Sequence, residues 1–263
     1  MRIRLTNCRP RRDLAALAVS SLLVTACAGS GETGLGVDLV SREQVQQMGV
    51  ESWQRIRSET PASDDQAAQR TAEQVADNLL RAAGANPDEW DVLVFEGDQA
   101  NAFALPGGKI GIYEGMFQAA GNEAQLAAVV AHEIGHLQAD HAQERVSSEV
   151  ATQGVVQLVS AALQVGNVAY ANAIAGALGA GARYGVLLPY SRNQELEADR
   201  TGLQLMAQAG YDPREALEFW RRMQQQGGGA PPAFLSTHPT PENRIKQLQE
   251  LMPAALETYR ANA

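Results

Sequence analysis

VVAHEIGHLQADH, residues 129–141, carries three of the four histidines of this 263-residue chain. Its other residues are mainly Val, Ala, Ile and Leu, and their spacing predicts a buried helix over about 123–147. His132 and His136 are four residues apart, so both imidazoles lie on one face of that helix, one turn apart. Two imidazoles at this spacing can bind one Zn²⁺ through ring nitrogens. Glu133 lies about 100° around the helix from His132. Its carboxylate can therefore contact a water bound to the metal, and need not bind the metal itself.

A third metal ligand must come from another part of the chain. His141 lies about 180° from His132 on the same helical wheel and is not expected to bind the metal. The segment SRNQELEADRTG, residues 191–202, opens with a capping box and predicts a helix on which Glu195 and Asp199 share one face. One of these carboxylates can bind the metal, while the other accepts a hydrogen bond from a ligand histidine and fixes its tautomer.

The rest of the sequence predicts a helix-dominated α+β fold with a small sheet. Strand signals are found at WDVLVFEG (90–97), and at NAFAL (101–105) and KIGIY (109–113), which a Pro-Gly-Gly turn joins into a hairpin. Further helices are expected at 41–58, interrupted at Gly49, at 65–83, at 213–225, and from Thr240 onward, with a short one directly after the hairpin.

The segment between residues 150 and 182 contains no charged residue. Its length would allow a membrane span, but several Gln and Asn side chains would then lie in hydrocarbon. A helical pair that is buried, or that covers the domain as a mobile lid, is therefore the prediction.

The N-terminus resembles a bacterial lipoprotein signal. Arginines precede an apolar run, residues 14–26, that is too short to span a bilayer comfortably, and VTAC ends on Cys27, the residue that would carry the lipid. Because Ala28 replaces the Asp that usually retains such proteins in the inner membrane, we expect an outer-membrane anchor on the periplasmic face.

The chain is acidic, with a formal net charge of −9 at pH 7. Loss of residues 1–26 removes five Arg and one Asp, which takes the net charge to −13. Such a chain repels the phosphate backbone, so no nucleic-acid partner is expected.

Five stretches occur in an order that resembles one protein family: NAFALPGGKI, LAAVVAHEIGHLQADHAQER, YSRNQELEADRTG, AGYDP and STHPTPENRI. They are similar to the membrane-associated zinc metallopeptidases that include HtpX, BepA and the mitochondrial Oma-type protease. The resemblance implies a gluzincin-type α+β fold and one zinc ion per chain. It implies that His132, His136 and Glu195 bind zinc and that Glu133 is the general base. Asp199 is then the carboxylate expected to accept a hydrogen bond from a ligand histidine.

The signal-like N-terminus and the metallopeptidase resemblance together predict a division of the chain and an activity. We expect a signal peptide (1–26), a lipidated tether with an N-terminal helical segment (27–65) and a zinc metallopeptidase domain (66–263). The expected function is a lipid-anchored periplasmic endopeptidase that hydrolyses misfolded or misassembled envelope proteins. The alternatives are a zinc-containing chaperone or outer-membrane assembly factor, and an amidase acting on the cell wall.

Two further segments are candidate parts of the site. The strand Asn101, Ala102, Phe103, Ala104 and Leu105 can present a free edge to an extended substrate, or be a plain structural hairpin. His238, in the HP motif, is expected in an extended segment before a helix. It can stabilise the oxyanion, act as a fourth zinc ligand that keeps the enzyme latent, or have no role.

Overall fold

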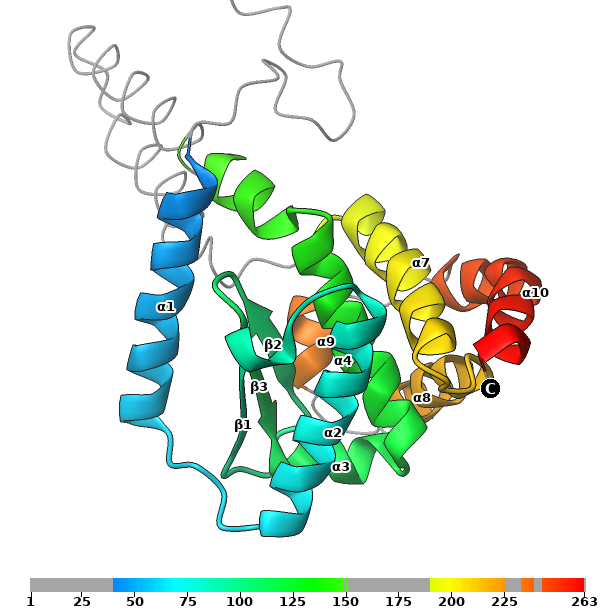
Figure 1. Ribbon diagram of the computed structural model, residues 1–263, viewed down its shortest axis with the longest axis horizontal. Coiled ribbons are helices and arrows are strands. Elements are labelled where there is room, and N and C mark those ends of the chain that lie inside the picture. The colour runs from blue at the N-terminus through cyan, green and yellow to red at the C-terminus, as the bar shows by residue number, and fades with distance from the viewer. Residues whose placement is uncertain (1–39, 149, 151–189, 226–232, 239–242, 263) are drawn as a thin grey trace, which may run out of the picture. The chain divides into compact units, whose positions relative to one another are not determined.

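A three-stranded sheet supports one side of the fold (Figure 1). The central strand β3 (Lys109–Tyr113) pairs in parallel with β1 (Asp91–Phe95) and antiparallel with β2 (Ala102–Leu105). The predicted hairpin is therefore confirmed, and its turn contains Gly107 and Gly108, with φ of 88° and 71°. Strand β2 lies at an edge of this sheet.

Helices make up most of the computed structural model, which describes residues 40–148, 150, 190–225, 233–238 and 243–262. These residues belong to one compact unit, Asp38–Ala263. The α-helices are α1 (Arg42–Glu59), α2 (Gln66–Ala82), α3 (Glu114–Ala120), α4 (Glu123–Gln138), α7 (Arg192–Gln208), α8 (Arg214–Gln225), α9 (Ala233–Thr237) and α10 (Asn243–Asn262), and η1 (Pro87–Glu89) is a 3₁₀ turn. The helix-dominated α+β class is confirmed.

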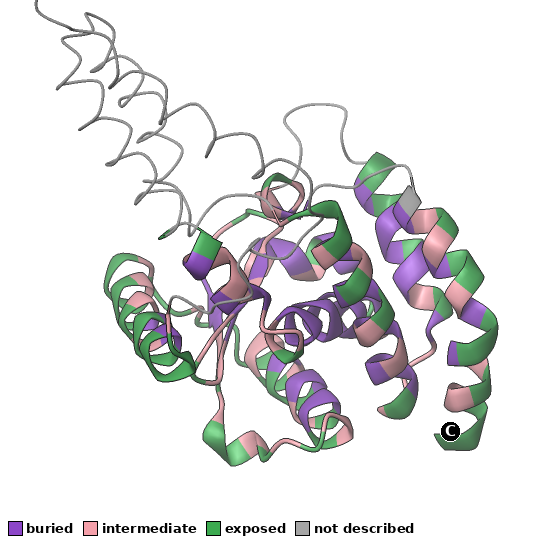
Figure 2. Cartoon of the chain, turned by 90° about the horizontal axis from the view of Figure 1, so that it is seen from above, coloured by how far each residue is buried: buried purple, intermediate pink, exposed green. Residues whose placement is uncertain are grey.

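Helix α4 runs through the middle of the core. Every residue from Gln125 to His136 is buried, and the helix contacts α2, α7, α8 and β2. Figure 2 shows buried residues gathered toward the middle of the fold and exposed ones on its outer helices. A helix that is buried on all sides needs apolar residues around its whole circumference, which the run of Ala, Val, Leu and Ile supplies. The site is therefore placed on the most enclosed element of the described chain.

Three expectations about the elements were wrong. Helix α1 passes through Gly49 without a break. The glycine allows a close contact with the hairpin turn instead, because a Cβ at this position would lie 2.0 Å from the carbonyl oxygen of Pro106. Helix α4 ends at Gln138, since Asp140 takes a left-handed conformation with φ of 54°, and a separate helical run begins at His141. The short helix α9 was not predicted, and its end replaces the extended segment expected around His238.

Other expectations fall on residues that the structure does not describe. These are the signal and tether, the uncharged segment 150–182, and the start of the last helix at Thr240. Among the described helices, none combines the length and the hydropathy that a membrane crossing requires.

Candidate metal centre

Four buried side chains from three parts of the fold converge on one point. His132 and His136 come from α4, Glu195 from α7, and His238 follows α9; one donor atom from each lies within 4.8 Å of all the others. The Nε2 atoms of His132 and His136 are 3.1 Å apart, and each is 3.4 Å from a Glu195 oxygen. His238 Nδ1 lies 3.1 Å from Glu195 Oε1. The sequence predicted the two histidines and narrowed the carboxylate to two candidates.

Small residues allow α4 and α7 to cross closely enough for this convergence. A Cβ on Gly135 would lie 2.9 Å from the carbonyl oxygen of Ala198, and one on Gly202 would lie 2.9 Å from the backbone nitrogen of His132. At both positions, the backbone of the neighbouring helix therefore occupies the space that a side chain would need.

Asp199 supports His132 from behind, as expected of the second carboxylate. Its Oδ1 is 3.0 Å from His132 Nδ1. The same carboxylate accepts two hydrogen bonds from Arg244, at 2.6 and 2.5 Å, and Arg244 also lies 2.7 Å from Glu195 Oε2. The guanidinium, fully buried, stacks 3.8 Å from the ring centre of Trp220. Sequence reasoning missed Arg244, for which the only signal was the motif STHPTPENRI.

His141 lies directly behind His136, although the helical wheel placed it on the opposite side. The wheel assumed a continuous helix, whereas the turn at Asp140 brings the His141 ring back toward α4. The Nδ1 atoms of His136 and His141 are 2.9 Å apart, and His141 is not one of the four clustered donors. Tyr190 stacks on the His136 ring, with 3.8 Å between ring centres.

Glu133 faces the edge strand and His238 rather than the other donors. Its Oε2 accepts a hydrogen bond from the backbone N–H of Ala104 at 3.3 Å, and its Oε1 lies 3.3 Å from His238 Nε2. The strand β2 and the residue predicted to be the general base are therefore in direct contact.

Burial and the carboxylates act in opposite directions on the pKa of the histidines. Burial and Arg244 lower the pKa of His132, but hydrogen bonds to Asp199 and Glu195 outweigh both and raise the pKa to about 9. Burial lowers the pKa of His136 to about 2. For Glu195, burial raises the pKa, but hydrogen bonds from the three histidines outweigh it and hold the pKa far below its usual range.

The donor set fits a divalent cation. Oxygens Glu133 Oε1 and Glu195 Oε2 are buried and accept no hydrogen bond of good geometry, although His238 Nε2 lies 3.3 Å from the first and Arg244 lies 2.7 Å from the second. Buried oxygens of this kind are available to a cation. Metal binding requires neutral histidines. In that state, the buried carboxylates Glu133, Glu195 and Asp199 outnumber the one buried cation of the described residues, Arg244, by two charges. A divalent ion would balance this charge, and His/His/Glu with an open position is a known zinc set.

Most of the chain matches one known protein family. Residues 65–252 match the sequence profile of Peptidase family M48. The chain belongs to peptidase family M48.

Within the M48 relatives, the chain is 37% identical over 183 residues to the mitochondrial metalloendopeptidase OMA1 of Schizosaccharomyces pombe, covering 69% of this chain and 52% of that protein. It is 34% identical to OMA1 of Arabidopsis thaliana, over 75% of this chain and 39% of that protein. It is 29% identical to the beta-barrel assembly-enhancing protease of Escherichia coli K12, over 77% of this chain and 42% of that protein. The chain thus spans about half or less of the length of these M48 relatives, and the resemblance read from the motifs is confirmed.

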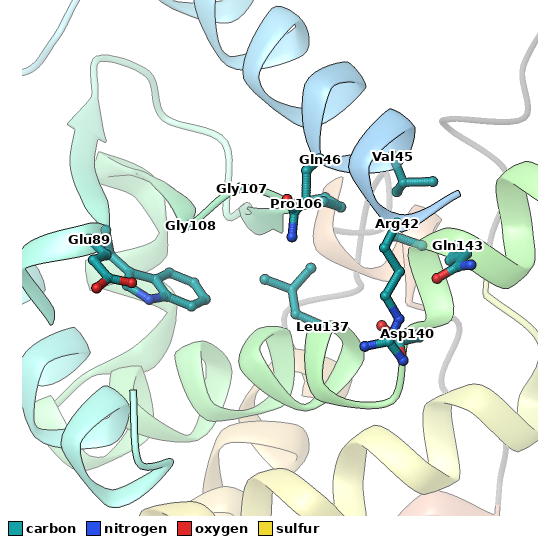
Figure 3. A pocket seen from close by; sticks show the side chains of 12 residues that line it. Arg42, Val45, Gln46, Glu89, Pro106, Gly107, Gly108, Leu137, Asp140 and Gln143 are labelled. Carbon is teal, nitrogen blue, oxygen red and sulfur yellow. The ribbon is translucent and has the colours of Figure 1, made fainter. Parts of the chain in front are cut away.

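A pocket lies at the C-terminal end of α4 (Figure 3). It has a volume of about 400 Å³ and lies between α1, the hairpin turn and the residues around Asp140. Arg42 and Asp140 point toward each other across its wall and form an ion pair at 2.5 Å. None of its lining residues belongs to the metal centre.

Proposed function

We propose that this chain is a zinc-dependent endopeptidase in which His132, His136 and Glu195 hold the metal. The observation that carries the proposal is the convergence of these donors beside Glu133 at the edge of β2. Zinc, when bound, lowers the pKa of water and polarises a carbonyl. Glu133 would take the proton of that water and return it to the leaving amine. Asp199 accepts from His132 Nδ1 and keeps Nε2 free to bind the metal.

The edge of β2 is the proposed substrate site. In a strand, the backbone groups of alternate residues point to the same side. The N–H of Ala104 points away from β3, toward Glu133, so the N–H and C=O of Ala102 also point away from β3. An extended chain can pair with this edge through main-chain hydrogen bonds, which favours unfolded substrates over particular sequences. On the same side, the carbonyl of Ala100 already accepts from Phe234 N–H at 3.0 Å, and the N–H of Ala104 donates to Glu133. Pairing with a substrate would therefore centre on Ala102.

Misfolded or misassembled envelope proteins are the proposed substrates, and the periplasmic face of the outer membrane is the proposed location. The signal-like residues 1–26 and Cys27 support a lipid anchor. The name of the Escherichia coli relative, a beta-barrel assembly-enhancing protease, supports an envelope role.

The decisive experiment is casein digestion by purified residues 28–263, with and without a zinc chelator, comparing wild type with Glu133→Gln and Glu195→Gln. Wild type should digest casein, and the chelator should stop it. Glu133→Gln should retain zinc, because no ligand is lost, but lose activity by at least about 10²-fold. Glu195→Gln should bind zinc more weakly.

Three outcomes would contradict the proposal. Near-wild-type turnover by Glu133→Gln would overturn the mechanism, and unchanged zinc affinity in Glu195→Gln would move the third ligand elsewhere. Full zinc loading without digestion would favour the chaperone or assembly factor. If the enzyme left casein intact but released peptide from peptidoglycan in a parallel incubation, the amidase would be favoured.

A further inference from the structure

We propose that His141 is a positioning residue that orients the metal ligand His136, and that Glu197 fixes the tautomer of His141. The inference rests on the proposed metal site but assigns a role to two residues outside the four donors. The atoms involved form a chain from the buried cluster to the surface, from His136 through His141 to the carboxylate of Glu197, whose side chain is 62% exposed.

The two ring nitrogens of His136 face different partners. Nε2 lies 3.1 Å from His132 Nε2 and 3.4 Å from Glu195 Oε1, so this atom faces the cluster. Nδ1 lies 2.9 Å from His141 Nδ1. A neutral histidine that binds metal through Nε2 must carry its proton on Nδ1, so the Nδ1–H of His136 donates to the Nδ1 lone pair of His141.

This donation fixes the second ring as well. Because His141 accepts at Nδ1, its own proton is on Nε2, which lies 3.4 Å from Glu197 Oε2. A carboxylate accepts but cannot donate when ionised, so Glu197 stabilises this tautomer over the other one. The ring protons of His136 and His141 then each have one position, and the His136 ring is held in one orientation.

The end of α4 creates this arrangement. On a continuous helix, residues five apart do not share a face, and the His141 ring would point away from His136. The left-handed Asp140 ends the helix and turns the chain, so that His141 is 1% exposed and lies against His136. Tyr190 covers one face of the His136 ring, so stacking and the hydrogen bond together restrict its rotation.

The two ligand histidines are therefore supported differently. His132 Nδ1 contacts the carboxylate of Asp199, which Arg244 holds in place. His136 Nδ1 contacts a neutral ring, with the carboxylate one residue further out. Outer partners of metal-binding histidines commonly change metal affinity by about 10–100-fold when they are lost.

The test measures zinc affinity by chelator competition, and the absorption spectrum of the Co²⁺-substituted protein, in wild type and three variants. His141→Leu removes the acceptor and should weaken zinc binding about 10–100-fold and change the cobalt spectrum. His141→Asn places its Oδ1 near the former Nδ1, so it should restore most of both properties. His141→Gln, the matched control, places its amide near the former Nε2 and should not restore them.

Equal affinities and spectra in all variants, or an Asn variant no better than the Leu variant, would show that His141 only fills space. Circular dichroism of the metal-free proteins checks the fold of each variant. A measurement that needs no substitution is ¹⁵N NMR of the zinc-loaded wild type: a proton on Nδ1 of His141 would overturn the assignment. Absence of zinc binding by the wild type would instead overturn the proposed function, so the two failures are distinguishable.

Discussion

His132 has a carboxylate on each side of its ring, Asp199 at Nδ1 and Glu195 at Nε2. In the metal-free protein these partners raise its pKa to about 9, against the effects of burial and Arg244. A ligand imidazole must be neutral, so metal binding has to displace the proton that His132 holds below pH 9. The same carboxylates that prepare the site for a cation therefore hold a proton there when the cation is absent.

We expect zinc binding at pH 7 to release about one proton from His132. Apparent zinc affinity should rise about tenfold per pH unit and level off near pH 9, where the ring is already neutral. The stability of the metal-free protein should change with pH in the opposite direction to the zinc affinity. The raised pKa of His132 adds to the free energy of unfolding below pH 6.5, and this contribution is lost as the pH rises to about 9. Calorimetry in buffers of different ionisation enthalpy measures the released proton, and no release at pH 7 would contradict the prediction.

His238 is placed where it can act as a fourth metal ligand. Its Nδ1 is 3.3 Å from His132 Nε2 and 3.1 Å from Glu195, and its Nε2 is 3.3 Å from Glu133. We expect His238→Ala to raise basal proteolysis, because an open metal position would become available to water. X-ray absorption of the resting enzyme would count the ligands, and Ser236→Ala, an exposed position on α9, is the control.

The other roles of His238 give different results for His238→Ala. A fall in kcat with unchanged metal coordination would identify an oxyanion donor instead of a latch. Unchanged activity and coordination would discard both roles.

Among the elements, the crossing of α4 and α7 determines whether the donors meet. Gly202 lies against backbone atoms of Ala131 and His132, which cannot rotate away as a side chain can. Strong local signals placed the start of both helices correctly in the sequence: the Ser191–Gln194 capping box is present at the start of α7, and the apolar run begins with α4. The crossing itself follows only from how the two helices pack.

We expect Gly202→Ala to lower the free energy of unfolding by about 1–3 kcal/mol, as overpacking of a core typically does. Zinc affinity should fall as well, because the added methyl group separates His132 from Glu195. Urea denaturation and chelator competition measure the two effects. Gln208→Ala, at the exposed end of α7, is the control, and an unchanged free energy in Gly202→Ala would contradict the role of the crossing.

The elements also show where sequence reasoning fails. The hairpin and the limits of α2 were predictable, because turn glycines and an Asp65 cap act over a few residues. The end of α4 was not, because a left-handed aspartate has no local signal comparable to glycine. Arg244 was missed for a different reason: its partner Asp199 is 45 positions away, and only the packed fold brings them together.

At the scale of the whole molecule, the proposed location depends on residues that precede α1. We expect Cys27→Ser to leave the domain folded and to release it from membranes into the soluble periplasmic fraction, because the lipid would no longer be attached. Fractionation and circular dichroism measure the two properties, and Ser30→Ala is a matched control in the tether. Recovery of Cys27→Ser in the membrane pellet would show that another segment holds the protein there, and the uncharged residues 150–182 would be examined next.

The donors of the metal centre also lie far apart along the chain, with His132 and His238 separated by 106 positions. A cation bound to both would close a loop of that length and reduce the freedom of the unfolded chain, much as a disulfide does. The metal would then serve as a cross-link in addition to its chemistry. Zinc starvation should accordingly shorten the lifetime of the protein in the cell, and not merely silence it.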